Sequence, residues 1–497
     1  MPCPPDIISE VASVFLKAIR LIATMSNVLR KSLLISLICF LFAVSSPSLF
    51  SQDTKGKKEI ELNFNDRRAR EMSLNILDEM EKILRKYYYD PNMRGIDLKA
   101  RIEEAKTRVK SRQHNWQMYR VFVQVLLDFD DSHTRVILPP RPDHFEYGFG
   151  LQMVGSSCVV TSVQKDSDAY KQGLRVGDVV LTLGRFTPNR RDLWKMLEVI
   201  YKLDPVNVLD LRIRGVDNTE RVVSITAATM TDKEFQLKMK ARKEARRAKI
   251  DVEPFKCQEI SPALLACKLY SFSVRKNDID KMITQALKYP KLILDMRGNH
   301  GGYVYIEQYL LSHFFDRQVK IADLVTREKT ETRMTKPLGD RQYKGELAVL
   351  IDSESASAAE MTARVIQLEK RGKVYGDVSS GSVMTSIALP FTSTVSSSFN
   401  YAIIKVGMSV TIADVIMRDG SRLEKTGVIP DEFLVPTGIA FARKTDPVLA
   451  VVAQVMGASL TAEKAGSFYF IVPKEEDYLD EEPDEASGEP TSSAQSP

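Results

Sequence analysis

The stretch Leu347-Ala-Val-Leu-Ile351, followed after a short turn by Ser355-Ala356-Ser357-Ala358-Ala359-Glu360, predicts a buried strand that leads into a helix. A serine at such a turn can project its hydroxyl from the sheet edge, beside the unpaired N–H groups that begin the helix. Because those N–H groups can stabilise an oxyanion, Ser357 is a candidate nucleophile. The alternative is structural, since Ser357 and Glu360 also have the spacing of a helix capping box.

A second motif, Leu294-Asp-Met-Arg297-Gly298-Asn299-His300-Gly301-Gly302, begins in the apolar run that starts at Lys291. Its glycines would let the backbone approach a substrate carbonyl with no side chain between them. Taken alone, the motif is also explained as a tight turn after a strand, which accounts for the glycines but not for their pairing with the serine motif.

The chain has 497 residues, of which 44% are hydrophobic and 27% charged, and its formal net charge is +5. This length accommodates two or three domains, and the composition is typical of a soluble globular protein. The basic residues gather mainly in one helical segment instead of alternating with aromatic side chains, so we expect no nucleic-acid partner.

Residues 1–52 have the layout of a secretory signal peptide. Lys31 precedes the apolar residues 32–44, which are too few for a typical membrane span, and Ser45-Ser46-Pro47-Ser48 follows. Met25 begins a basic leader of ordinary form and is the expected true start. We therefore predict export to the periplasm or the extracellular space. The alternative is an uncleaved leader that anchors the protein in a membrane.

The rest of the chain divides into regions of different pattern. Residues 56–140 are predicted to form a helical domain, residues 141–230 alternate short strands with turns, and residues 231–254 form a charged, helical linker. Residues 255–458 alternate apolar strands with amphipathic helices, as in an α/β core, and residues 473–497 are acidic and expected to be disordered. The apolar stripes of the helical domain are Met72, Ile76, Met80 and Leu84, and then Trp116, Tyr119, Val123 and Leu126.

The cysteines and histidines indicate no metal site and no cofactor. Cys158, Cys257 and Cys267 lie beyond the leader without CxxC spacing. Cys257 and Cys267 could pair in an oxidising compartment, but buried free thiols are favoured. The five histidines show no HxxxH or HxH spacing, and Arg297–Gly302 lacks the frame of a nucleotide-binding loop.

Residues 141–230 resemble a PDZ domain of the type found in bacterial proteases. The resemblance rests on Gly173-Leu-Arg-Val-Gly177-Asp178 and on the loop Tyr147-Gly148-Phe149-Gly150-Leu151. It implies that the N–H groups of Gly148, Phe149, Gly150 and Leu151 receive a peptide carboxylate and that the peptide adds as an edge strand. The alternative is a small β-domain that acts only as a spacer.

The order of these regions, with the two core motifs, resembles the carboxyl-terminal processing (tail-specific) serine peptidases and the related tricorn core, over roughly residues 60–455. The resemblance implies a crotonase-like/ClpP-like α/β peptidase core with an N-terminal helical domain and an inserted PDZ-like β-domain. It also implies that Ser357 is the nucleophile. The oxyanion hole would consist of the Ala358 N–H and an N–H in the Gly301-Gly302 turn.

The general base departs from the tail-specific pattern. Those peptidases carry a lysine in a segment of the form Gly-Glu-x-Thr-x-Gly-Lys, whereas this chain has Gly376-Asp377-Val378-Ser379-Ser380-Gly381-Ser382. In the tricorn pattern the base is a histidine in a Ser-His-Thr-like motif, which matches Asp131-Ser132-His133-Thr134. Imidazole has a suitable ordinary pKa, and Ser132 and Glu424 match the residues that orient and charge-stabilise it. His300 is a competing base, ranked as a contributor to pocket shape.

The sequence therefore predicts an exported serine endopeptidase that cleaves polypeptides through an acyl-enzyme on Ser357, with His133 as base. The PDZ-like domain would bind substrate C-termini or gate the groove, and unstructured chains or exposed C-termini are the expected substrates. The alternative is a catalytically inactive, peptidase-like protein that binds peptides or serves as a scaffold.

Overall fold

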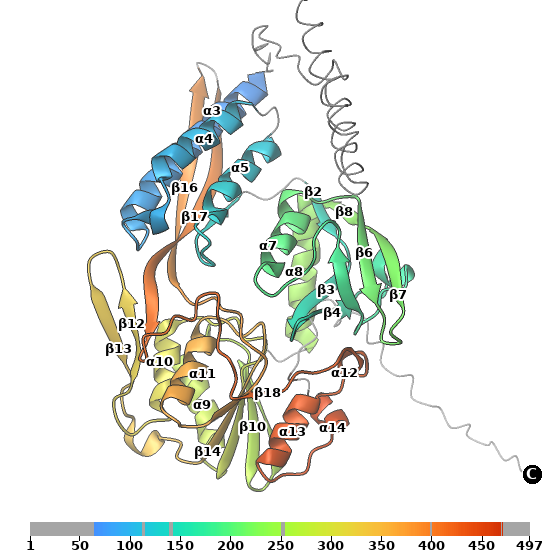
Figure 1. Ribbon diagram of the computed structural model, residues 1–497, viewed down its shortest axis with the longest axis vertical. Helices are drawn as coiled ribbons and strands as arrows, with labels where there is room; N and C mark the ends of the chain where they lie inside the picture. The colour runs from blue at the N-terminus through green and yellow to red at the C-terminus, as the bar shows by residue number, and fades with distance from the viewer. Residues whose placement is uncertain are drawn as a thin grey trace, which may run out of the picture. The chain divides into compact units, whose positions relative to one another are not determined.

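The core of the protein is a six-stranded sheet, shown with the rest of the computed structural model in Figure 1. Neighbouring strands are parallel except β9, which is antiparallel to β10. In spatial order the strands are β18 (Glu432–Phe433), β15 (Lys373–Gly376), β14 (Glu346–Ile351), β11 (Lys291–Asp295), β10 (Leu264–Leu269) and β9 (Phe255–Ser261). The structure describes residues 64–111, 115–138, 143–249, 254–397, 400–468 and 470.

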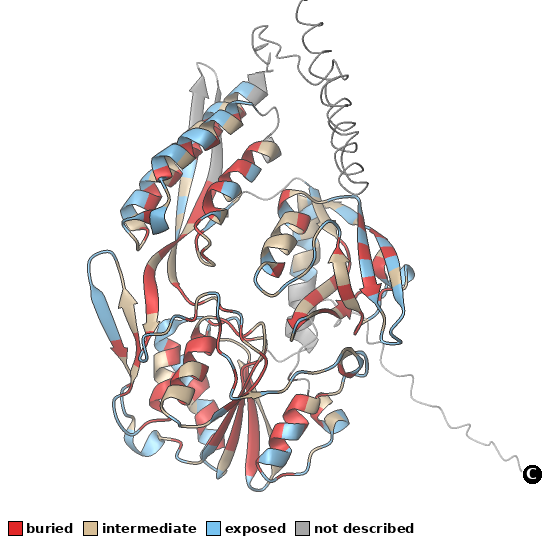
Figure 2. Cartoon of the chain, viewed as in Figure 1, coloured by how far each residue is buried: buried red, intermediate tan, exposed pale blue. Residues whose placement is uncertain are grey.

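Helices cover both faces of this sheet, which is why its middle strands are almost continuous runs of Leu, Ile and Val. Alternate side chains of each strand pack in two separate buried clusters, one on each face, and Figure 2 shows the strands as buried. One face carries α9 (Lys276–Ala286), α10 (Val304–Ser312) and α11 (Ala358–Leu368), and the other carries α13 (Pro447–Val455) and α14 (Ala462–Gly466). The predicted α/β organisation of the core is thus confirmed.

The N-terminal helices pack on a long β-hairpin from the distant end of the chain (Figure 1). The elements are α3 (Phe64–Tyr87), η1 (Met93–Gly95), α4 (Leu98–Lys110) and α5 (Asn115–Leu127), with β16 (Thr385–Ser397) and β17 (Asn400–Met417). The predicted stripe of α3 is buried. In α5 the predicted Tyr119 and Leu126 are buried and Val123 is half-buried, while the side chain of Trp116 lies outside the described residues. Met118, Phe122 and Val125 are buried as well. Val406, Met408 and Val410 of the hairpin complete this hydrophobic cluster.

Strand β17 also pairs with two further segments. Its C-terminal part pairs with β12 (Lys320–Val325), which in turn pairs with β13 (Thr330–Met334). Its middle part pairs with β1 (Arg135–Ile137). Because β1 starts two residues after His133, the pairing Arg135↔Ser409 fixes the loop that carries this histidine. A 3₁₀ turn, η3 (Gly339–Arg341), precedes β14.

A five-stranded antiparallel sheet occupies the middle of the sequence, with β3 at one edge. Its strands are β3 (Phe149–Val154), β4 (Ser157–Val163), β5 (Val179–Leu183), β6 (Val208–Arg214) and β7 (Glu220–Thr226), accompanied by α6 (Asp168–Lys171), α7 (Leu193–Glu198) and η2 (Val199–Leu203). A separate pair, β2 (Asp143–Glu146) with β8 (Ala228–Thr231), leads into α8 (Asp232–Lys249), the helix expected in the charged linker. The short α12 (Gly438–Ala442) lies near this sheet, since Gly438 directly contacts Gly177.

Cys257 and Cys267 form a disulfide, so the expectation of free thiols at these positions is wrong. The two residues are direct partners in the β9–β10 pair, and their Cα atoms lie 4.0 Å apart. The spacing of ten residues between the two cysteines did not indicate that they would face each other across two paired strands. Cys158 is a buried free thiol, as expected.

Two predicted segments, the leader (1–52) and the acidic tail (473–497), lie outside the described residues. Within the described ranges, no helix has both the length and the apolar character that crossing a membrane requires.

Candidate active site

Ser357 occupies a sharp turn between β14 and α11. Its backbone φ and ψ are 55° and −117°, a region that residues with a side chain rarely adopt. The residue immediately precedes the first turn of α11, and its side chain is only partly buried. The conformation resembles the strained strand-to-helix elbow that exposes a nucleophilic serine.

The other serine of the motif, Ser355, is fully buried and has a structural role. Its hydroxyl donates to the Met296 carbonyl at 2.8 Å and accepts from the Asp352 N–H at 2.9 Å. Asp352 Oδ1 in turn accepts the N–H groups of Ser355 at 3.0 Å and Gly298 at 2.8 Å. One carboxylate thus holds the serine loop against the glycine turn.

The glycine turn packs directly on Ser357. A Cβ atom on Gly301 would lie 2.7 Å from the Ser357 Cβ, and one on Gly302 would lie 2.4 Å from the Ser273 nitrogen, so neither position accepts a side chain. The Gly301 N–H donates to Asn299 Oδ1 at 2.9 Å and is therefore occupied. Among the described residues, the N–H groups of Gly302 and Ala358 have no protein acceptor.

His133 lies in the loop between α5 and β1, and Asp131 organises this loop. The buried Asp131 carboxylate accepts the His133 N–H at 2.8 Å and the Thr134 hydroxyl at 2.9 Å. It also accepts the hydroxyl of Thr411, on β17, at 2.8 Å. The aspartate next to the predicted motif therefore fixes the backbone that carries the histidine, a role that the sequence did not indicate.

Ser132 connects His133 to Glu424. The Ser132 hydroxyl donates to Glu424 Oε2 at 2.9 Å and lies 2.7 Å from His133 Nδ1. Because the Ser132 hydroxyl proton points to the Glu424 carboxylate, the Ser132 oxygen accepts the proton on His133 Nδ1. This assigns the tautomer in which His133 Nε2 carries no proton and can act as an acceptor. Burial lowers the pKa of His133 to about 4, against the opposing charge of Asp131. Burial raises the pKa of Glu424 despite its hydrogen bonds.

The segment that lacks the expected lysine joins the serine to this histidine group. The Ser357 N–H donates to the Ser382 carbonyl at 3.1 Å, and the next N–H, that of Val383, donates to Glu424 Oε2 at 2.9 Å. Two consecutive residues thus link the serine turn to the carboxylate that binds Ser132. Within the described part of the chain, no hydrogen bond joins His133 to Ser357 itself.

Glu360, in the first turn of α11, binds the same segment, residues 379–382. Its carboxylate, fully buried, accepts four hydrogen bonds: the N–H groups of Ser357 (2.9 Å), Gly381 (2.7 Å) and Ser382 (2.9 Å) and the Ser379 hydroxyl (2.6 Å). Burial raises the pKa of Glu360 to about 7 although these donors oppose the shift. The capping-box spacing predicted the role of Glu360 at the start of the helix, but its contacts with residues 379–382 were not predicted.

Glu360→Gln is expected to lower the free energy of unfolding by about 2–4 kcal/mol, because the new amide group faces N–H donors and leaves them unpaired. The effect should depend on pH. The raised pKa of Glu360 stabilises the native state fully below pH 4.5, and this contribution is lost as the pH rises through about 7. Urea unfolding of both proteins should therefore show a smaller difference at pH 8 than at pH 5. A difference that is constant with pH would contradict the shift.

The predicted peptide-binding loop, Gly148–Leu151, leads into and begins β3, the edge strand of the five-stranded sheet. Phe149 and Leu151 are buried in the core of this sheet, and Gly148 has a φ of 73°. The sheet contacts the six-stranded core through Gln152 Nε2, which donates to Asp352 Oδ2 at 3.0 Å. The function of the loop stays a prediction.

His300 is exposed at the glycine turn. Within the described ranges, no group of three or more His, Cys, Asp or Glu side chains is placed to bind a metal ion.

Comparison with known proteins finds a family that the core resembles. Residues 264–433 match the model of peptidase family S41. Curated relatives include a probable CtpA-like serine protease of Staphylococcus haemolyticus (24% identity; 48% of this chain and 44% of the relative) and the tail-specific protease of Haemophilus influenzae (24%; 52% and 38%). A third is the carboxy-terminal processing protease CtpB of Bacillus subtilis (25%; 49% and 48%). The chain thus spans less than half the length of these relatives.

Mature CPAF is a solved structure with the same fold, at a TM-score of 0.56 and 14% identity, over 81% of this chain and 96% of that chain. The family match begins with β10 and ends with β18, and it contains both the serine turn and the glycine turn. Residues 264–433 are therefore similar to the domain of peptidase family S41.

Proposed function

We propose that the protein is a serine endopeptidase in which Ser357 is the nucleophile and His133 the general base. The observation that carries the proposal is the continuous chain of contacts from His133 through Ser132 and Glu424 to Val383 and Ser382, which accepts the Ser357 N–H. The strained backbone at Ser357 and the two unpaired N–H groups beside it support the same assignment.

In the proposed reaction, Ser357 Oγ attacks the peptide carbonyl carbon while its proton moves to His133 Nε2. The oxyanion accepts hydrogen bonds from the N–H groups of Gly302 and Ala358. Collapse of the tetrahedral intermediate breaks the C–N bond, and His133 returns the proton to the leaving amine. Water then attacks the acyl carbonyl carbon while His133 accepts its proton; the C–Oγ ester bond breaks, and His133 returns the proton to Ser357 Oγ as the carboxylic acid leaves. The serine and histidine must come within hydrogen-bond distance when substrate binds, as happens in many enzymes.

We propose that the β3–β7 sheet acts as the PDZ-like domain and binds the C-terminus of a polypeptide at Gly148–Leu151. Two contacts support a link between this sheet and the active site. Gln152 binds Asp352, and Arg190 binds Asp377 at 2.7 Å; these aspartates directly follow the neighbouring strands β14 and β15. Peptide binding at β3 would then affect the loops that carry Ser357 and Ser382.

The test is reaction of the folded protein with a fluorophosphonate probe, followed by mass spectrometry of the labelled peptide. We expect one phosphonyl group per chain, on Ser357, and no labelling after denaturation in urea. Hydrolysis of an unstructured polypeptide such as casein should be blocked by the label. Absence of labelling, or labelling at another residue, would favour the inactive peptide-binding protein.

A further inference from the structure

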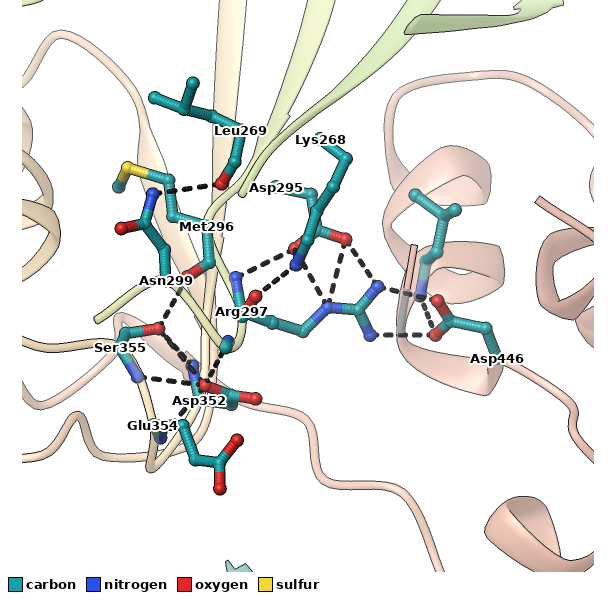
Figure 3. Close-up of polar contacts among 12 residues, drawn as sticks. Lys268, Leu269, Asp295, Met296, Arg297, Asn299, Asp352, Glu354, Ser355 and Asp446 are labelled. Atoms are coloured by element: carbon teal, nitrogen blue, oxygen red, sulfur yellow. Dashed lines mark hydrogen bonds and ion pairs between the residues drawn. The ribbon is translucent and has the colours of Figure 1, made fainter. Parts of the chain in front are cut away.

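Four charged side chains at the start of the glycine turn form a buried group whose members bind one another (Figure 3). They are Lys268 on β10, Asp295 at the end of β11, Arg297 in the turn and Asp446 before α13, and none is more than 5% exposed. The group contains two cations and two anions, so its formal charge is zero. Such a balance is needed because a buried charge without a partner is strongly unfavourable.

Arg297 is the centre of this group. Its guanidinium binds Asp446 through two parallel hydrogen bonds, Nη1–Oδ1 at 2.9 Å and Nη2–Oδ2 at 2.6 Å. The same group donates from Nη2 to Asp295 Oδ2 at 2.6 Å. Lys268 Nζ lies 3.3 Å from Asp295 Oδ1 and also donates to the Arg297 carbonyl. Burial lowers the pKa of Lys268, whereas for Asp295 the two cations outweigh burial and lower the pKa.

Hydrogen bonds fix the backbone of the turn at Gly298, Asn299 and Gly301. The Gly298 N–H donates to Asp352, and the Asn299 carbonyl accepts the Ala356 N–H at 2.9 Å. Asn299 also donates from its side chain to the Leu269 carbonyl at 2.9 Å and accepts the Gly301 N–H. The Gly302 N–H, the next along the chain, is left without a protein acceptor in this part of the structure.

We propose that Asp446 is a positioning residue for catalysis: through Arg297, and as one member of a charge-balanced group with Lys268 and Asp295, it orients the Gly302 N–H toward the oxyanion. This inference rests on the proposed function. It ties a residue at the start of α13, 149 positions after Arg297, to the active site. Because electrostatic stabilisation acts through donors placed before the reaction, a small displacement of the turn lowers the rate without removing any reacting group.

Asp446→Asn tests the charge while preserving the helix cap. Asp446 Oδ1 accepts the Leu449 N–H at 3.0 Å, and asparagine is an equally good N-cap residue. The variant leaves the buried group with one excess positive charge. Lys268→Met removes that excess with a side chain of similar length, so the double variant Lys268→Met/Asp446→Asn is again neutral. Asp178→Asn is the matched control, since Asp178 is also buried and bound to an arginine, Arg221, but directly precedes β5 of the five-stranded sheet.

The measurement is the second-order rate constant for fluorophosphonate labelling. We expect Asp446→Asn to lower it by about 100-fold, the double variant to recover about tenfold of that loss, and Asp178→Asn to stay within about twofold of the wild type. Hydrogen exchange of residues 297–303 should rise in Asp446→Asn and fall again in the double variant. For a peptide substrate, kcat should fall while KM changes little.

Two results would overturn the inference. The first is an Asp446→Asn variant whose labelling rate constant and hydrogen exchange equal those of the wild type. The second is a double variant whose fold-loss in the labelling rate constant equals the product of the fold-losses of the two single variants, because the charges then do not act together. If Asp446→Asn fails to fold, we compare Asp446→Glu with the wild type, because glutamate keeps the charge but displaces it. An unchanged labelling rate constant and unchanged hydrogen exchange in this variant overturn the inference. A wild type that is not labelled overturns the proposed function and with it the catalytic role of Asp446.

Discussion

Replacement of Ser357 by alanine is expected to lower kcat/KM for peptide hydrolysis by about a million-fold and to abolish fluorophosphonate labelling. The attacking oxygen comes from this side chain alone, and no other hydroxyl of the motif can replace it. Ser355 is buried, and its hydroxyl is already engaged with the Met296 carbonyl. The matched control is Ser355→Ala, which should remain labelled at Ser357 although it is less stable.

The backbone at Ser357 adds a second part to this prediction. A φ of 55° with a ψ of −117° costs about 1–3 kcal/mol for a residue with a Cβ atom but little for glycine. Ser357→Gly should therefore be as inactive as Ser357→Ala but more stable to urea than both Ser357→Ala and the wild type. Equal stability of the glycine and alanine variants would show that the turn is not strained, and residual labelling in either variant would show that Ser357 is not the nucleophile.

Local patterns predicted the core strands well because each strand is a short apolar run bounded by turn residues. The predicted run Leu347–Ile351 lies within β14, which starts one residue earlier, and the apolar run predicted to start at Lys291 is β11. The hairpin β16–β17 was not predicted, although Val406, Met408 and Val410 alternate as strand residues should. Its partners are helices more than 250 residues earlier in the chain, so no local pattern indicated where this hairpin packs.

The candidate site shows the same division between local and long-range information. Ser357 and the glycine turn were recognisable because each lies directly after an apolar strand. Ser132 and Glu424, which are 292 residues apart, were paired only by resemblance to known peptidases, and the structure places them in hydrogen-bond contact. The roles of Asp131 and Asp446 depend on partners from other elements, and single aspartates in loops carry no signal of such partners.

His133→Ala is expected to lower kcat/KM by about 10⁴-fold, because Ser357 then has no base to accept its proton. His300→Ala should have a far smaller effect, since His300 is an exposed residue of the glycine turn and the proposed reaction does not use it. Labelling rates and peptide hydrolysis measure both variants. Equal losses in the two variants, or full activity of His133→Ala, would contradict the assignment of the base.

The pH dependence of kcat/KM identifies this histidine independently of mutation. Burial lowers the pKa of His133 from 6.5 to about 4, so the base is neutral and competent down to about pH 4, and the acidic limb of the profile should lie there instead of near 6.5. The same shift stabilises the fold fully above pH 6.5, and this contribution is lost as the pH falls toward 4. Activity must therefore be assayed under conditions where circular dichroism reports a folded protein. An acidic limb near 6.5 in the folded protein would mean that the base is a solvated imidazole, which excludes the partly buried His133 and directs attention to the exposed His300.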